Sequence, residues 1–264
     1  MKYRYGLLFI LAAVSGVYLS IFYVNPYNGT IDLSEMILQF SGSRGSFALG
    51  FSYEELASFV MHLIPTFLFE LYAGIMLYRH FCTASIYVFS RYPHRVKWYL
   101  KEVCYLGGTT GAFHIILLLA STVTTVCRFE LRIDYAGMLL TTYHFLLYTL
   151  WVYIMTLSVN LIAIFFGSSA AYALVVGVQM VCTALLNLMD LLVRNSADRL
   201  SYEKLLIWNP IAHLVLGWRG SYMRTDLNAS LLLFFLLGAA VTAAGAVIVK
   251  KHDILVSDSE TGGI

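Results

Sequence analysis

The chain has 264 residues, of which 59% are hydrophobic and only 12% are charged, and its mean hydropathy is +0.75. Too little polar surface is available to cover a water-soluble globule, which excludes a soluble enzyme and any sizeable domain outside a membrane. The formal net charge of +2 is uninformative as a total, and the sequence shows no signature of nucleic-acid binding. We therefore expect an integral membrane protein without a nucleic-acid partner.

Five charge-free runs locate the membrane spans, because a hydrocarbon core about 30 Å thick needs roughly 20 residues of helix. The longest run, 135–189, has no Asp, Glu, Lys or Arg over 55 residues, so it must fold back. Gly167 and the two serines after it supply the turn. The sequence therefore predicts one all-α domain, 1–264, a polytopic bundle of six transmembrane helices. The expected spans are 5–24, 56–78, 103–126, 136–164, 170–193 and 228–249.

The first span is apolar over about 20 residues, longer than the roughly 7 to 15 residues of a signal-peptide core. We therefore expect it to be retained. Ala12, Gly16 and Ser20 recur every four residues within it. Such a row of small side chains predicts a face where another helix approaches closely.

Glu70 is the only acid well inside a predicted span. An ionisable group in the membrane is costly unless it faces protein or water, so this intramembrane carboxyl is a functional candidate. The alternative is a carboxyl that is protonated, or bound to a polar neighbour such as His114, and that only holds helices together.

Metal and redox chemistry have little support in the sequence. The histidines at 62, 114 and 144 lack the i, i+3 or i, i+4 spacing of a metal pair, so we expect no metal site. The four cysteines are scattered and form no C-x-x-C pair, and we interpret them as apolar fillers.

The connection 79–102 is too polar to insert into a membrane and too apolar to stay in water. Its apolar part suits a short helix on the membrane surface that ends at Pro93, and basic residues follow. One interpretation is an anchor for lipid headgroups. The other is a docking element for a cytoplasmic partner, because apolar residues flanked by Arg and Tyr are typical of interface hot spots. The candidate docking residues are Phe81, Ile86, Phe89, Arg91, Tyr92, Arg95 and Trp98.

An apolar stretch also lies within the outer connection 194–226. It is interrupted by Asn-Pro and Gly, so it cannot cross the membrane, but it can dip into it as a short re-entrant gate. The alternative is an amphipathic surface helix without a transport role. The candidate gate residues are Trp208, Asn209, Pro210, His213 and Trp218.

Six spans place both termini on one side of the membrane. Nine basic and four acidic residues lie on that side, and eight basic and ten acidic residues lie on the other. The basic residues of the first group cluster beside span ends, where the positive-inside rule acts, so we expect both termini to be cytoplasmic.

The connection after the second span contains Phe89-Ser90-Arg91-Tyr92-Pro93-His94-Arg95 and Trp98-Tyr99-Leu100-Lys101, and the connection before the last span contains Asn209-Pro210. In these two connections the chain resembles the membrane subunit of type-2 ABC exporters. The resemblance covers nearly the whole chain. It implies a permease of the bacterial cytoplasmic membrane whose coupling helix, within 79–102, docks onto a separate ATPase. It also implies pairing with a second copy or a sister permease. One departure is that only Met1 to Arg4 precede the first span, where such permeases commonly carry an amphipathic helix.

The chain contains no G-x-x-x-x-G-K-[ST] loop, so ATP and Mg must be bound by the partner, and we expect no catalytic residue and no cofactor in this chain. The apolar and aromatic composition favours an amphipathic substrate: a peptide, an antibiotic or a lipid-like compound. Some small relatives serve antimicrobial-peptide immunity. Two alternatives stay open, a non-transporting immunity or sensor protein and a membrane-embedded enzyme such as a protease.

Overall fold

The computed structural model describes residues 2–26, 29–41, 53–87, 94–195, 206–218 and 226–251. This part of the chain is mostly helical and contains six helices that are long and apolar enough to cross a membrane, which confirms the expected number of spans. The chain is therefore a multi-pass membrane protein. The helices are α1 (Lys2–Tyr23), α3 (Tyr53–Ala73) continued by α4 (Met76–Tyr87), α5 (Arg95–Arg128), α6 (Tyr135–Phe166), α7 (Ser168–Asn195) and α9 (Leu227–Lys251).

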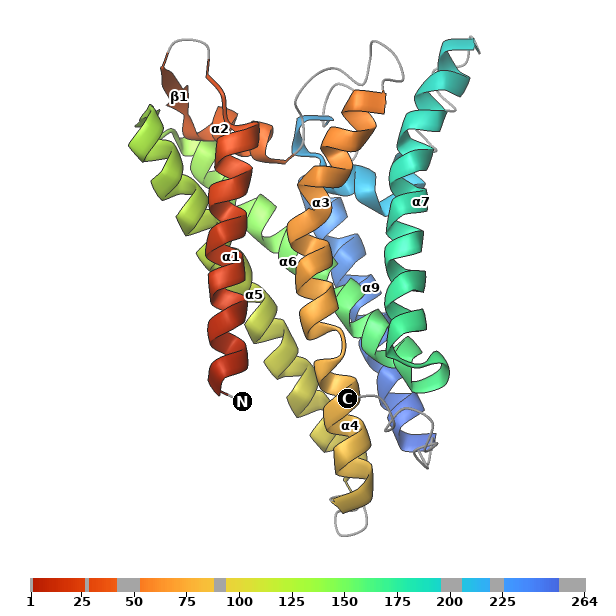
Figure 1. Ribbon diagram of the computed structural model, residues 1–264. Coiled ribbons are helices and arrows are strands. Elements are labelled where there is room, and N and C mark those ends of the chain that lie inside the picture. The colour runs from red at the N-terminus through yellow and green to blue at the C-terminus, as the bar shows by residue number, and fades with distance from the viewer. Residues whose placement is uncertain are drawn as a thin grey trace.

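The long helices lie side by side in one bundle (Figure 1). The start of α1, the end of α4 and the end of α9 lie at one end of the bundle, and β1 and α2 lie at the opposite end (Figure 1). We refer to the first as the inner end and to the second as the outer end, following the predicted cytoplasmic position of the termini.

The α1–α5 contact is formed by the row of small residues in the first span. A Cβ at Gly16 would lie 2.9 Å from the Cβ of Ala120, so only glycine allows the two backbones to approach this closely. Toward the outer end, the hydroxyls of Ser20 and Thr125 are 2.9 Å apart, and Arg128 donates to the Ser20 carbonyl at 3.0 Å. Helices pack in this way in lipid, where close approach and interhelical hydrogen bonds replace hydrophobic driving force.

The central helix is α6, which contacts α2, α3, α4, α5, α7 and α9. Its Trp151, Val152 and Leu157 are buried. By contrast, Ile10 and Val14 on α1 are more than 60% exposed, as expected of side chains that face acyl chains. The bundle therefore buries α6 and presents apolar outer faces to lipid.

The turn after α6 requires a glycine. Gly167 has φ 78° and ψ 164°, and its amide donates to the Ala163 carbonyl at 3.0 Å. This positive φ is strained for any residue with a side chain, so the chain reverses between α6 and α7 at this residue.

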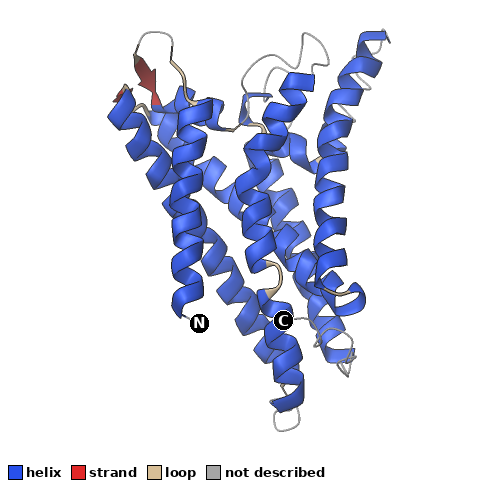
Figure 2. Ribbon diagram, viewed as in Figure 1, coloured by secondary structure: helices blue, strands red, loops and turns tan. Residues whose placement is uncertain are grey.

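The outer connection after α1 contains structure that the sequence did not predict. The strands β1 (Thr30–Asp32) and β2 (Glu130–Arg132) pair in parallel, so the all-α expectation missed a two-stranded sheet (Figure 2). The helix α2 (Leu33–Phe40) follows β1 and buries Met36, Ile37 and Phe40. Three-residue strands are too short to show an alternating pattern, which explains the miss.

Candidate functional site

The second span is interrupted within the bundle. The helix α3 ends at Ala73, Gly74 and Ile75 form a turn, and α4 begins at Met76. A Cβ at Gly74 would lie 2.9 Å from Val159 Cγ1, so the turn packs directly against α6. We call Gly74 and Ile75 the α3–α4 break.

A side chain of α6 satisfies the backbone groups that the break frees. The Tyr78 amide donates to Asn160 Oδ1 at 2.9 Å. The Asn160 amide nitrogen donates to the Thr156 carbonyl at 2.8 Å and lies 3.5 Å from the Ala73 carbonyl oxygen. In the membrane every backbone polar group needs a partner, so Asn160 makes an interruption at this depth tolerable.

Glu70 lies one turn before the break and is fully buried. Its Oε2 accepts a hydrogen bond of 2.7 Å from Gln179 Nε2 on α7, and Gln179 is also fully buried. Within the described residues, Glu70 Oε1 and Gln179 Oε1 have no hydrogen-bond partner. The two oxygens can therefore accept a further hydrogen bond, or bind a proton or a small cation.

The suggested hydrogen bond between Glu70 and His114 is wrong. His114 Nδ1 is 3.1 Å from the Thr110 carbonyl oxygen of its own helix. The neighbouring residues Phe69 and Phe113, with ring centroids 4.7 Å apart, occupy the contact between α3 and α5. Glu70 instead points to α7.

The outer half of the bundle contains a cluster of histidines that sequence analysis missed. His62 on α3 has its Nε2 3.1 Å from the Tyr148 hydroxyl of α6. The rings of His144 and His114 have their centroids 4.3 and 6.5 Å from the Tyr148 ring. Phe40 of α2 covers the cluster, with its ring centroid 5.3 Å from that of His144. We call His62, His114, His144 and Tyr148 the histidine cluster.

His62, His114 and the α6 pair of His144 and Tyr148 are far apart in sequence, so local spacing indicates only that His144 and Tyr148 share a face of one helix. A further signal is that His62, His144 and Tyr148 lie in the outer halves of their predicted spans and His114 lies at the middle of its span. Within the described residues, no group of three His, Cys, Asp or Glu side chains is arranged to hold a metal ion. The cluster joins α3, α5 and α6 through ring packing and hydrogen bonds.

Asp134 fastens α2 to the start of α6 at the outer end. Its carboxylate accepts hydrogen bonds from the Ser34 amide at 3.0 Å and from the Gly137 amide at 3.1 Å. Desolvation opposes ionisation of this carboxyl, but the hydrogen bonds from Ser34 and Gly137 outweigh it and lower the pKa of Asp134 below its usual value. Asp134 is therefore charged at neutral pH and caps α6 as an anion.

The predicted gate residues form a compact segment, 206–218, which we call the outer segment. Its 3-10 helices are η2 (Pro210–Leu214) and η3 (Leu216–Trp218). Asn209 caps η2 by accepting from the Ile211 amide at 3.0 Å, and it donates to the Cys182 carbonyl of α7 at 2.7 Å. His213 contacts the Ser230 hydroxyl of α9 at 2.8 Å.

These contacts place Asn209 of the outer segment against the middle of α7. Cys182 lies thirteen residues before the last residue of α7, which is about 20 Å along a helix. It also falls in the apolar stretch of α7 that can cross a membrane. Trp208 is 85% exposed and Pro210 half-buried, whereas Asn209 and His213 are buried; the side chain of Trp218 is outside the described part.

The predicted docking residues fall where α4 and α5 meet. Phe81 and Ile86 are on α4, although their side chains are outside the described part, and Phe89, Arg91 and Tyr92 lie wholly outside it. Arg95 and Trp98 are in the first turn of α5. His80 of α4 and Glu102 of α5 approach to 3.4 Å and join the two helices.

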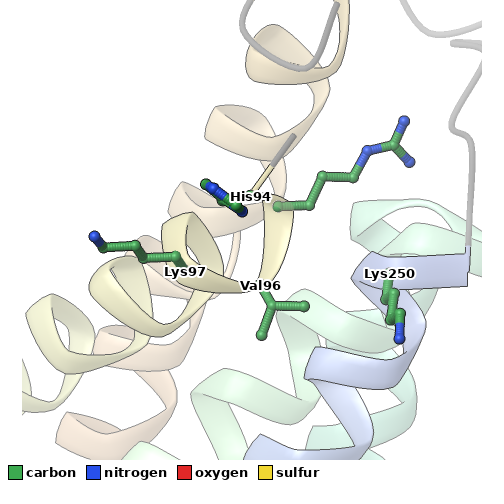
Figure 3. Close-up of a pocket in the computed structure, with 5 residues that line it drawn as sticks. His94, Val96, Lys97 and Lys250 are labelled. Atoms are coloured by element: carbon green, nitrogen blue, oxygen red, sulfur yellow. The ribbon is translucent and has the colours of Figure 1, made fainter. Parts of the chain in front are cut away.

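A basic cavity of about 550 Å³ lies beside this connection. Figure 3 shows His94, Val96 and Lys97 at the start of α5 and Lys250 at the end of α9, and Arg95 completes the described lining. None of these side chains is acidic. This inner corner of the bundle therefore favours anionic groups, whether of lipid or of a docked protein.

Comparisons of the chain with protein-family models, with curated proteins and with solved structures found no match. A function for this chain is therefore inferred from its own residues and contacts.

Proposed function

We propose that this protein is the membrane permease subunit of an ABC exporter and moves an amphipathic substrate with ATP that a separate ATPase hydrolyses. The observation that carries the proposal is the hairpin of α4 and α5, which projects at the inner end beyond α1 and α9 (Figure 1). A projecting pair of helices attached to the bundle through a break is suited to receive a partner and to transmit its movement. Of the docking residues predicted from the sequence, Arg95 and Trp98 lie in the first turn of α5, within this hairpin.

Two polar contacts, one within the hairpin and one between the hairpin and α6, have a mechanical role. The His80–Glu102 contact ties α4 to α5, so a docked ATPase would move both together. Asn160 ties the start of α4 to α6. Bending at the α3–α4 break would act on these polar contacts and on the packing of Gly74 against Val159 of α6. Such hinges allow rigid-body switching between inward-open and outward-open states.

A chain of contacts leads from the break to the outer segment. Glu70 binds Gln179 on α7, and the Cys182 carbonyl on the same helix binds Asn209. Residues three apart lie on one face of a helix, so Gln179 and Cys182 share the face that α3 and the outer segment contact. Movement of α3 relative to α7 would displace the outer segment, which gives this segment the role of a re-entrant gate.

The partners follow from what the chain lacks in sequence. It has no nucleotide-binding loop, so ATP and Mg belong to the ATPase, and the permease itself performs no catalysis. A second permease copy or a sister chain would complete the pathway, in a bacterial cytoplasmic membrane with both termini cytoplasmic. The substrate class is a peptide, an antibiotic or a lipid-like compound.

Co-purification of the permease with an ATPase encoded beside it, followed by substrate-stimulated ATP hydrolysis, tests the proposal. The double variant Phe89→Ala with Arg91→Ala should weaken ATPase binding about tenfold or more, because interface hot spots contribute several kcal/mol each. The matched control is Phe22→Ala with Arg132→Ala, which removes the same residue types from exposed positions at the outer end. Equal binding by both double variants, or no ATPase bound by the wild-type chain, would contradict the assignment.

A further inference from the structure

The buried carboxyl of Glu70 lies in a setting that lacks a counter-charge. Within the described residues it forms no ion pair, and its one hydrogen bond comes from the neutral amide of Gln179. An ionised carboxylate in the apolar part of a bundle needs a cation or several donors to replace its hydration. One amide donor does not meet that need.

The hydrogen-bond inventory of the pair shows what is missing. Gln179 Nε2 already donates to Glu70 Oε2 at 2.7 Å. The two atoms without a partner are both acceptors, Glu70 Oε1 and Gln179 Oε1. A protonated carboxyl has one O–H donor. A single proton on Glu70 Oε1 therefore makes that atom a donor and leaves Gln179 Oε1 as an acceptor.

A route for that proton begins one turn nearer the inner end. Ala73, three residues after Glu70 and therefore on the same helix face, lines a cavity of about 30 Å³ between α4 and α5. This volume is sufficient for a water molecule. His80 and Glu102 line the same cavity and are partly exposed, so they connect it with the inner surface.

The other titratable groups around Glu70 are less suited to exchange its proton. Tyr172 on α7 already donates its hydroxyl hydrogen to the Phe67 carbonyl at 3.1 Å. His62, on α3 itself, lies eight residues toward the outer end, about 12 Å along the helix. Asn160, the polar side chain of α6 that binds the backbone at the break, does not titrate.

We propose that Glu70 and Gln179 form a proton-binding site inside the bundle, and that the proton exchanges with the inner side through the small cavity between Ala73 and the His80–Glu102 pair. In the closed arrangement of α3 and α7, Glu70 is neutral. Release transfers the proton from Glu70 Oε1 to water, leaves a carboxylate, and requires the contact between α3 and α7 to loosen so that water can solvate the charge. The α3–α4 break is the place where this loosening is least costly. The site does not depend on ATPase docking.

Infrared spectroscopy of the purified full chain in lipid nanodiscs tests this directly. The wild type should show the C=O stretching band of a protonated carboxylic acid at neutral pH, and the band should be lost in Glu70→Gln. The control Glu130→Gln, at an exposed carboxylate of the outer end, should keep the band. Absence of the band from the wild type, or its survival in folded Glu70→Gln, would overturn the proposal.

The exchange route has its own readout, which is the rate at which this band shifts after transfer into D2O. The double variant His80→Ala with Glu102→Gln should keep the band but slow its shift by at least about tenfold, because positioned acid and base groups accelerate proton transfer by such factors. An unchanged rate in this variant would overturn the route. A band that disappears on addition of Na+ or K+ at constant pH would instead identify a metal-cation site and overturn the assignment to a proton.

Discussion

The histidine cluster and the Glu70–Gln179 pair are both buried polar groups, but their surroundings differ. At the histidine cluster α3, α5 and α6 are continuous, and Phe40 of α2 covers the rings from the outer end. The Glu70–Gln179 pair lies one turn before an interrupted helix whose backbone is held by the side chain of Asn160. We therefore expect the part of the outer half where α3, α5 and α6 meet to be a fixed frame, and the α3–α4 break and the contact between α3 and α7 to be the moving parts.

The largest effect is expected from Asn160→Leu. The substitution leaves the Tyr78 amide without its acceptor in an apolar setting, which should lower the free energy of unfolding by about 2 to 4 kcal/mol. Thermal unfolding of the purified protein in detergent measures it. Asn228→Leu is the control, because Asn228 is exposed at the start of α9. An equal loss in both variants would show that Asn160 does not hold the break.

Gly74→Ala should have the next largest effect. The new Cβ would meet Val159 Cγ1 at 2.9 Å, and such overpacking costs about 1 to 3 kcal/mol of unfolding free energy. Gly108→Ala is the matched variant, since nothing lies within 4 Å of a Cβ at that helical position. That change should leave stability unchanged or raise it by up to about 1 kcal/mol. A tolerated Gly74→Ala would mean that α3 and α4 can move away from α6 without cost.

A smaller loss is expected from Tyr148→Phe in the outer frame. It removes the hydroxyl that lies 3.1 Å from His62 Nε2 but keeps the ring, so stability should fall by about 1 kcal/mol. Substrate-stimulated ATP hydrolysis should be unchanged. Loss of that activity at unchanged stability would place the histidine cluster in the transport machinery and remove the distinction between frame and moving parts.

The smallest effect concerns pH and Asp134. Because its pKa is lowered in the folded protein, Asp134 contributes stability above the pKa of the unfolded chain, and that contribution is lost as the pH falls through the lowered pKa. The melting temperature of wild type should therefore exceed that of Asp134→Asn at neutral pH and converge with it in acid. A constant difference at all pH values would exclude this carboxylate as the cause.

The sequence was a good guide to the apolar helices and a poor guide to their interruptions. The charge-free run 135–189 requires two spans, and Gly167 with the two serines after it is the turn signal within the run. The α3–α4 break has no such signal. Pro65 is the residue most expected to interrupt the second span, but it lies inside α3. The helix is interrupted instead at Gly74, where the backbone packs against Val159 of α6.

The sequence predicted a buried polar residue where a single side chain was conspicuous, but it did not predict the partner of that side chain. Glu70 is conspicuous as an isolated acid in an apolar run, but its partner Gln179 is 109 positions away and depends on which helix α3 packs against. The short helix α2 was missed for a related reason. Its eight residues form an amphipathic pattern too brief to distinguish from a loop, and its burial depends on the surface that α6 offers.

The most direct test of a fixed outer frame and a moving inner hairpin is a pair of distance measurements between spin labels. One pair joins position 79 on α4 to position 247 on α9, and the control pair joins position 22 on α1 to position 133 before α6. On addition of the ATPase and ATP, we expect a shifted distance for the first pair and an unchanged distance for the second. An unchanged first pair, or equal shifts in both, would contradict it.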